Sequence, residues 1–353
     1  MAEFLGLGIT HYPPLAGTNA NMAGLLRWTL ADPDIPGVEK DPVSWPAPAR
    51  AEWSDDGGMA AAGRHRAELT MHLARCRQAL DLFVPDVVVV WGDDQYENFR
   101  EEVVPPFCVL AYEDVEVRAF AYTSKLDQPN AWGLPDDLTI TIRGAARLGR
   151  TLAGALMGAG FDVAYSYKPR GDADFPHAIV NTQVFLDYED AGRRFPYPIL
   201  PVTVNCYGQH VIARRGGMAR FADIVVEDLD PVGPSPERCF ALGAAVARAL
   251  EAGDLRVALV ASSSWSHAFL CDRTWHVRPD TVADRRLYDA LAVEDWAAWQ
   301  KETIGDIVEA GQHEMLNWFC LAGAVAELRL PLRWSTFVAT DVFNSNKCFA
   351  IFG

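Results

Sequence analysis

Short apolar runs rich in β-branched residues recur along the chain and limit the folds that are open to it. Several of these runs are almost continuously apolar, as expected for strands that are covered on both faces. They occupy residues 4–10, 87–91, 161–166, 199–205, 257–262 and 336–342. The chain is therefore expected to build its core around a buried sheet.

Helical patterns separate the apolar runs. They cover residues 59–83, 138–157, 237–251, 284–291, 296–309 and 312–328. Strands that alternate with helices predict an α/β fold, in which helices flank a mainly parallel or mixed central sheet. The sequence has no internal repeat and no tract typical of a linker, so residues 1–353 are expected to form a single domain.

Two long stretches fit neither pattern. Residues 32–58 are rich in Pro, Asp and Trp, and residues 112–137 mix polar side chains with Pro, Gly and Trp. Long irregular segments in a compact domain are often functional. We expect both to cross the surface as covers or lids of the domain.

Charge and composition exclude several classes of function. The formal net charge is −16 and the pI is near 4.9, so a nucleic acid would be repelled. The sequence shows neither a signal-peptide pattern nor a run of 18 apolar residues, and no membrane association is expected. The seven cysteines are widely spaced without a CxxC pair, which favours reduced thiols in a cytoplasmic protein.

Ionisable residues follow several of the predicted strands at the point where each strand ends. His11 follows the first strand, the acidic segment 93–97 follows the second, and His177 and His267 come after the third and the fifth. Ligands of open α/β sheets bind beyond the carboxyl ends of the strands. Three histidines and a carboxylate cluster in equivalent places therefore predict a functional site there.

The sequence lacks the motifs of two common kinds of functional site. The sequence contains no GxGxxG or GxxxxGK[ST] phosphate loop, which disfavours nucleotide binding. It also contains no GxSxG nucleophile elbow. The strand-end histidines and carboxylates are therefore the principal candidates for chemistry.

A set of short motifs, in order along the chain, resembles the class III extradiol ring-cleavage dioxygenases, in particular the catalytic B subunit of protocatechuate 4,5-dioxygenase. The similar segments are GITH at 8–11, VVVVWGDDQ at 87–95, RCFALG at 238–243, SSWSH at 263–267 and HEMLNW at 313–318. Each motif is short, but together they span most of the chain. The resemblance implies the α/β fold of that B subunit.

The resemblance also implies a cofactor and a reaction. Members of this family hold Fe(II) with two His and one Glu, and they open catechol-type or aminophenol-type rings with O₂. Carried over position by position, His11 and Glu314 match metal ligands, and His267 matches the catalytic acid/base. His177 lies where the family has a second His that contacts substrate. In the resembled enzyme a separate small subunit covers the site.

One departure from the family pattern concerns the second metal-binding His, whose place is taken by Gln95. Three arrangements remain open: Gln95 or a neighbouring carboxylate (Asp94 or Glu97) binds the metal, a different His supplies the missing nitrogen, or the iron site is lost. The geometric candidate for a different His is His65. The predicted helix 59–83 leads into the second strand and therefore begins at the carboxyl edge of the sheet. His72 lies about 10 Å farther along the axis.

Several functions remain compatible with this pattern. The first is an Fe(II)-dependent extradiol dioxygenase, with Tyr12, Trp265 and Tyr207 as candidate ring contacts that are equally compatible with the core. The second keeps the fold but uses Zn(II), Mn(II) or another divalent ion for hydrolytic or non-catechol chemistry. The third is a non-enzymatic binding relative. A homo-oligomer, with a dimer as the simplest form, is the expected assembly.

Overall fold

The computed structural model describes residues 1–171, 174–217, 220 and 229–353. Within these residues the main sheet has eight strands in the order β6-β3-β7-β2-β8-β1-β10-β9. Its strands are β1 (Glu3–Ile9), β2 (Val87–Asp93), β3 (Phe107–Leu110), β6 (Ala164–Ser166), β7 (Ile199–Val204), β8 (Arg256–Ser262), β9 (Leu332–Val338) and β10 (Lys347–Phe352). A separate ribbon pairs β4 (Val115–Arg118) with β5 (Thr139–Ile142).

Four neighbouring strands of the main sheet, β1, β8, β2 and β7, are mutually parallel. The strands β10 and β9 extend one edge in antiparallel fashion, and β3 is antiparallel to β7. The carboxyl ends of the four parallel strands therefore meet at one edge, where α/β proteins bind their ligands. The predicted α/β class, with a mainly parallel but mixed central sheet flanked by helices, is confirmed.

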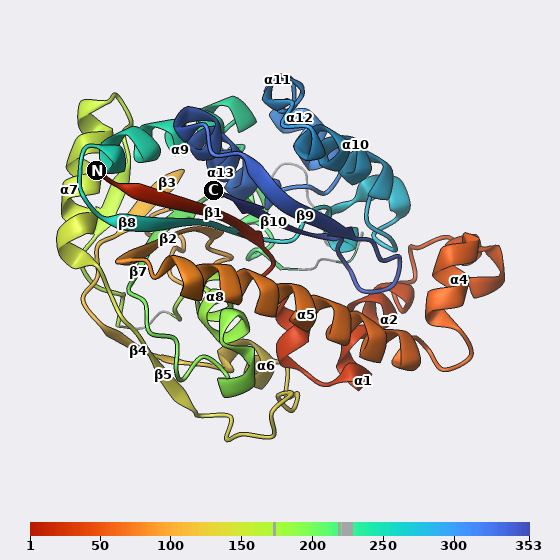
Figure 1. Cartoon of the computed structure of the whole chain (residues 1–353). Helices are drawn as coiled ribbons and strands as arrows, with labels where there is room; N and C mark the ends of the chain where they lie inside the picture. Colours follow the sequence, from red (N-terminus) through yellow and green to blue (C-terminus); the bar gives the residue numbers. More distant parts are fainter. Residues whose placement is uncertain (172–173, 218–219, 221–228) are drawn as a thin grey trace.

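Helices cover both faces of the sheet, with α5 and α8 on one side and α7, α9 and α13 on the other (Figure 1). The helices are α1 (Asn19–Met22), α2 (Gly24–Leu30), α3 (Gly37–Lys40), α4 (Ala47–Trp53), α5 (Met59–Phe83), α6 (Ala121–Lys125), α7 (Ala146–Gly158), α8 (His177–Leu186), α9 (Pro236–Glu251), α10 (Thr281–Ala292), α11 (Trp296–Trp299), α12 (Ile304–Glu309) and α13 (Met315–Leu328).

The central strand β2 shows why both faces need a cover. All of its residues are buried. Val89 and Trp91 enter the core on the α9 and α13 side, whereas Val88 and Val90 enter the core on the α5 and α8 side. Successive side chains of a strand point to opposite faces, so a continuously apolar strand stabilises two helical layers at once.

The predicted elements agree with the structure except in a few places. Residues 138–157 form strand β5 and helix α7 rather than one helix. The chain changes direction at Gly144, where a side-chain Cβ would lie 2.2 Å from the carbonyl oxygen of Tyr112. The predicted helix 296–309 is likewise two helices, α11 and α12. The run at 336–342 overlaps β9, which begins earlier, at Leu332, and ends at Val338.

The elements that were not predicted include β3 and β10 of the main sheet and the helix α8 that packs on it. Helix α8 is buried along its whole length and therefore lacks the polar face that marks an amphipathic helix. Strands β3 and β10 are short and are held by their neighbours in the sheet. No helix in the described ranges is both long and apolar enough to cross a membrane.

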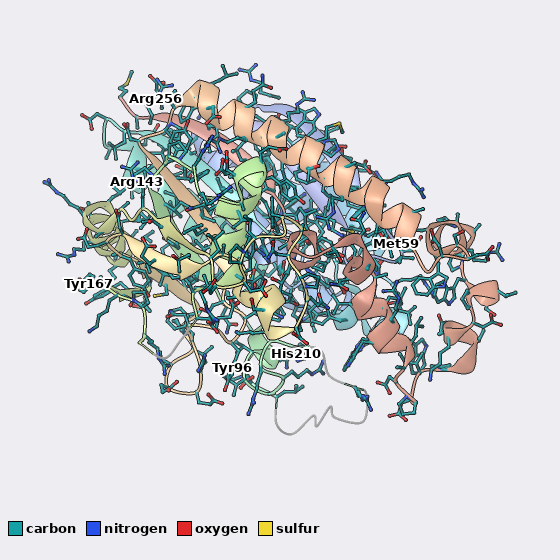
Figure 2. All side chains as sticks on the ribbon, turned by 90° about the horizontal axis from the view of Figure 1, so that it is seen from below. Met59, Tyr96, Arg143, Tyr167, His210 and Arg256 are labelled. Atoms are coloured by element: carbon teal, nitrogen blue, oxygen red, sulfur yellow. The ribbon has the colours of Figure 1, made fainter. Side chains whose placement is uncertain are left out.

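The loops at the carboxyl edge of the sheet gather at one end of the molecule. Figure 2 shows Tyr96, after β2, and His210, after β7, at the same end and far from Arg256, which begins β8. Arg256 donates hydrogen bonds to the carbonyl oxygen of Phe83 at the end of α5. One end of the sheet therefore anchors α5, and the opposite end carries the polar loops.

Candidate metal centre

His11 lies just past the end of β1 and is almost fully buried. Its Nδ1–H donates a hydrogen bond of 2.6 Å to the carbonyl oxygen of Ser262, the last residue of the neighbouring strand β8. The other ring nitrogen, Nε2, lies 3.4 Å from Glu314 Oε2 and 3.8 Å from Asp93 Oδ1. Burial, together with nearby His177, holds the pKa of His11 well below its usual value. The ring is therefore neutral and presents an unprotonated nitrogen to the two carboxylates.

Asp93 is the last residue of β2 and is fully buried. The side-chain amide of Asn317 donates to its Oδ1 at 3.4 Å, and its Oδ2 has no hydrogen-bond partner among the residues that the structure describes. Burial, reinforced by Glu97, raises the pKa of Asp93 to about 6. A buried carboxylate with a free oxygen is costly unless a cation lies beside it.

His177 is the first residue of α8, and Glu97 holds it on two sides. Its Nδ1–H donates to Glu97 Oε1 and its backbone N–H donates to Glu97 Oε2, each at 2.9 Å. Burial alone would lower the pKa of His177, but Glu97, Asp93 and Glu314 outweigh burial and raise it to about 9. The positive charge of His177 thus partly offsets the surrounding carboxylates.

Side chains of His11, Asp93 and His177 each offer one ligand atom, and these atoms lie within 4.8 Å of one another. The two imidazole rings are 5.0 Å apart, with an interplanar angle of 83°. In both rings the Nδ1–H is held by an oxygen outside the cluster. This is the arrangement that orients metal-binding histidines in proteins.

Glu314 adds a second carboxylate beside His11, immediately before α13. Its Oε1 accepts a hydrogen bond of 2.8 Å from the Tyr207 hydroxyl. Its Oε2 has no hydrogen-bond partner in the described part of the chain. Burial and the proximity of Asp93 raise the pKa of Glu314 well above its usual value. Two carboxylates with free oxygens around one neutral imidazole fit a divalent cation, which would relieve their repulsion.

His267 is held differently from the other two histidines. Its Nε2 lies 3.3 Å from Glu314 Oε1, while its Nδ1 has no hydrogen-bond partner within the described ranges. Burial, assisted by the charge of Lys347, lowers the pKa of His267 to about 3. The ring is therefore neutral near pH 7.

A cavity of about 370 Å³ opens beside these groups. It is lined by Pro13, Pro14, Leu25, Trp28, Gln95, Tyr122, Leu126, His177, Tyr207, Gly217, His267, Phe269, Glu314 and Asn344. Its inner wall is polar and its outer wall is apolar. The volume lies in the range of small-molecule sites.

Comparison with known proteins bears directly on this arrangement. A family model described as the catalytic LigB subunit of aromatic ring-opening dioxygenase matches residues 217–350, which include His267 and Glu314. The 2,3-dihydroxyphenylpropionate/2,3-dihydroxicinnamic acid 1,2-dioxygenase of Mycolicibacterium paratuberculosis is 28% identical over 196 residues, 56% of this chain and 48% of that protein. The protein of the same name from Mycobacterium sp. (strain MCS) is 30% identical over 225 residues, 64% of this chain and 53% of that protein. These matches support the class III extradiol ring-cleavage dioxygenase family for this chain.

The extent of these matches limits what they establish. The chain spans about half the length of the curated relatives it matches. An uncharacterized protein from Escherichia coli K12 aligns with 78% of this chain and 91% of its own, at 15% identity and a TM-score of 0.43. A score this low says nothing about function. The similarity to extradiol dioxygenases rests on the sequence matches.

Gln95 stands where the resemblance implies the second metal-binding His, and its amide donates a hydrogen bond to the carbonyl oxygen of Gly216. Gln95 lines the cavity but is not part of the His11 cluster. Asp94 is directed elsewhere, since its carboxylate accepts the backbone N–H groups of Glu97, Asn98 and Phe99. Asp94 therefore stabilises the turn after β2, and Glu97 orients His177.

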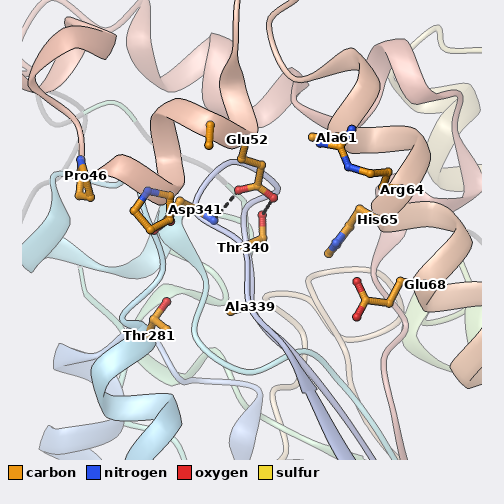
Figure 3. A pocket seen from close by; sticks show the side chains of 12 residues that line it. Pro46, Glu52, Ala61, Arg64, His65, Glu68, Thr281, Ala339, Thr340 and Asp341 are labelled. Carbon is orange, nitrogen blue, oxygen red and sulfur yellow. Dashed lines mark hydrogen bonds between the residues drawn. The ribbon is translucent and has the colours of Figure 1, made fainter.

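His65 lies apart from the cluster of His11, Asp93 and His177. Its ring packs beside Tyr12 and Phe343, with centroid distances of 6.2 and 5.0 Å. It lines a different cavity of about 580 Å³, and Figure 3 shows it there with Glu52 and Thr340. The sequence argument placed the start of α5 correctly at the edge of the sheet, but His65 packs against Tyr12 and Phe343 and is not part of the His11 cluster. The structure thus gives no support to His65 as a ligand.

The three predicted aromatic contacts have different surroundings. Tyr207 lines the cavity and bonds Glu314. Trp265 is fully buried among aromatic residues that include Trp299 and Trp318. Tyr12 is buried under the ammonium group of Lys347, which lies 3.6 Å from the ring centroid. The core alternative therefore fits Trp265 and Tyr12, and the structure favours Tyr207 alone of the three as a cavity contact.

Two contributions of this site were not expected from the sequence. Asp93 was not among the ligand candidates, although it shares the face of β2 that carries Trp91. The strand extends to Asp93, two residues beyond the predicted end. The approach of His177 to His11 had no local signal, because it depends on how α8 packs against β2 and β8. The signal in the sequence that could have pointed to Asp93 was the length of strand β2.

Asp284, in α10, ties together the segments that carry the site. Its buried carboxylate accepts hydrogen bonds from Ser266, Gln312 and Asn346.

Replacing Asp284 by Asn is expected to lower the free energy of unfolding by about 1–3 kcal/mol, because an amide N–H would face these donors. Urea unfolding would measure the change. Asp289→Asn, at an exposed position of the same helix, should stay within about 0.5 kcal/mol of the parent protein. Equal stabilities for the two variants would contradict this assignment.

Proposed function

We propose that the chain is an Fe(II)-dependent extradiol dioxygenase that opens a catechol-type or aminophenol-type ring with O₂. The observation that carries the proposal is the buried cluster of His11, Asp93, His177 and Glu314 beside a cavity that also contains His267. Two imidazoles and a carboxylate are the ligand set of non-haem iron oxygenases. The family-model match over residues 217–350 and the names of the relatives support the same reaction.

The ligands in this proposal are His11 and Glu314, with His177 or Asp93 completing the set. His177 would supply an imidazole nitrogen in place of the one that Gln95 lacks, because a metal ion at Nε2 would displace the proton that this nitrogen carries in the charged ring. This is a form of the alternative in which a different His replaces the missing one. Fe(II) bound there would supply a Lewis acid that polarises the diol and brings it next to O₂.

The protein's own side chains supply proton transfer and orientation. Neutral His267 accepts a proton from a substrate hydroxyl, and a positioned base of this kind contributes a factor of about 10²–10⁴ to the rate. Tyr207 holds Glu314 through its hydroxyl, so the carboxylate keeps one orientation. Glu97 likewise fixes the ring of His177.

Access to the cavity involves one of the two irregular segments. Residues 112–137 contribute Tyr122 and Leu126 to its wall. Residues 32–58 contribute instead to the separate cavity around His65, through Pro46 and Glu52. We propose that 112–137 covers the active site in the role that the small subunit has in the resembled enzyme.

The proposal is tested on protein purified without oxygen and loaded with Fe(II). It expects bound iron, O₂ uptake with a panel of catechols, and a yellow ring-opened product. Zinc bound without O₂ uptake would point instead to the hydrolytic alternative, which the extra carboxylate of Asp93 makes chemically reasonable. A protein that binds no divalent metal would leave the non-enzymatic alternative.

His267→Gln separates proton transfer from metal binding. We expect the variant to keep its iron while turnover falls by about 10²–10⁴-fold, since an amide is not a base. Iron content and O₂ consumption would be measured on the same preparation. His72→Gln, on the remote part of α5 beside Trp334, is the matched control and should turn over normally. Full activity of His267→Gln would remove His267 from the mechanism.

A further inference from the structure

The outer part of the catalytic cavity is an apolar groove. A neighbouring cavity of about 200 Å³ shares six lining residues with the catalytic cavity, so the two spaces are continuous. The shared residues are Pro13, Pro14, Leu25, Trp28, Tyr122 and Leu126. The groove reaches the surface at Trp28 and Leu126, whose side chains are 39% and 51% exposed. A ring bound beside His267 would therefore extend any substituent along these apolar side chains.

The described lining of the groove offers no cation to an anionic substituent, and the charge of His177 in the cavity is paired with Glu97. Among the described residues that line either space there is no lysine or arginine. The residues outside the described ranges, 172–173, 218–219 and 221–228, include none in the sequence either. The polar residues of the groove, Asn21, Thr123 and Gln128, are uncharged.

Two basic residues close to the groove in sequence have partners elsewhere. Arg27, on α2, donates to the carbonyl oxygens of Ala20 and Gly57, each at 2.9 Å. Lys125, next to Leu126, lies 2.7 Å from the carboxylate of Asp174. A carboxylate that entered the groove would therefore lose water without gaining an ion pair, in a protein whose net charge is −16.

We infer that this site selects ring diols whose substituent is uncharged and apolar, and that it discriminates against substrates with a carboxylate tail. The inference rests on the proposed function for the position of the ring. It sets this chain apart from its relatives, because the name 2,3-dihydroxyphenylpropionate dioxygenase denotes an acidic substrate. The groove of Leu25, Trp28 and Leu126 is the element that determines the specificity.

A pair of substrates that differ at one end tests the inference. 3-Propylcatechol and 2,3-dihydroxyphenylpropionate have side chains of similar length, which end in a methyl group and a carboxylate. For the iron-loaded protein, kcat/KM is expected to be at least about tenfold higher for 3-propylcatechol, because the carboxylate has no partner. Equal values, or a preference for the acid, would overturn the inference.

A variant should reverse the preference. Leu126→Arg places a cation in the groove at a half-exposed position, and kcat/KM for the acid should rise by about tenfold relative to 3-propylcatechol. Leu82→Arg is the matched control, since Leu82 is 78% exposed on α5, and it should leave the ratio unchanged. An unchanged ratio in Leu126→Arg would exclude the groove as the determinant.

Binding measurements keep this inference separate from the proposed function. Calorimetric titration of the iron-loaded protein without oxygen gives the affinity for each compound, whether or not the ring is opened. Tighter binding of 3-propylcatechol without turnover would support the selectivity and refute the proposed reaction. Turnover of both compounds with equal efficiency would support the reaction and refute the selectivity.

Discussion

Replacing His11 by alanine is expected to remove the metal ion and abolish turnover while the fold remains. His11 lies beside both carboxylates, with its Nε2 3.4 Å from Glu314 Oε2 and 3.8 Å from Asp93 Oδ1. Loss of a residue that only orients a ligand typically costs about 10–100-fold in metal affinity or activity. Loss of a ligand should cost more than that, so metal affinity and kcat/KM should each fall by more than about 100-fold.

Metal titration and O₂ uptake would measure the effect of His11→Ala, and circular dichroism would check the fold. His72→Ala removes a histidine that packs on Trp334 and Phe349 instead, and it should keep metal and activity. If His11→Ala bound iron as tightly as the parent protein, the proposed centre would be wrong. The proposal therefore requires that His11→Ala loses both metal affinity and O₂ uptake, and that His72→Ala loses neither.

A methyl group at Gly243 is expected to cause the largest loss of stability. Helices α9 and α13 cross where Gly243 meets Cys320 and where Gly323 meets Phe240. A Cβ on Gly243 would lie 1.7 Å from the carbonyl oxygen of Cys320, which belongs to the backbone and cannot rotate away. The helices would have to separate, and α13 begins directly after Glu314. Damage to the packing should therefore reach the metal centre as well.

For Gly243→Ala we expect the free energy of unfolding to fall by about 3 kcal/mol or more, because overpacking costs outweigh the better helix propensity of alanine. Gly154→Ala in α7 is the matched control, since open space surrounds its Cβ position and the change should stabilise the protein by about 0.5–1 kcal/mol. Urea denaturation would measure both changes. Shifts of the same sign in the two variants would refute the close crossing.

Most of the buried framework followed from the sequence because its signals are local. The apolar runs gave β1, β2, β7 and β8, and the long Ala-rich pattern gave α5 with the bounds that the structure has. Predictions failed where the decisive contact is distant in sequence. The strand β5 inside the predicted helix 138–157 forms against β4, and the backbone of Tyr112 leaves room only for glycine at position 144.

The candidate site shows the same difference between local signals and contacts that are distant in sequence. The sequence by itself placed His11 and His267 at the carboxyl ends of strands and, by ordered resemblance, Glu314 at the start of a helix. The structure brings these three side chains together. Their roles as ligands and base stay predictions until metal and turnover are measured. Position along a strand or helix is a local property, and it could therefore be predicted from the sequence.

The tertiary structure alone decided which other side chains join His11. It brought ligand atoms of Asp93 and His177 within 4.8 Å of one on His11, directed Asp94 into a turn, and packed His65 against Tyr12 and Phe343 outside the cluster. A side chain's direction depends on the pleat of its strand, and its partners depend on how helices pack across the sheet. Neither is encoded in the spacing of residues along the chain, and so the composition of the metal centre emerged only when the strands were side by side.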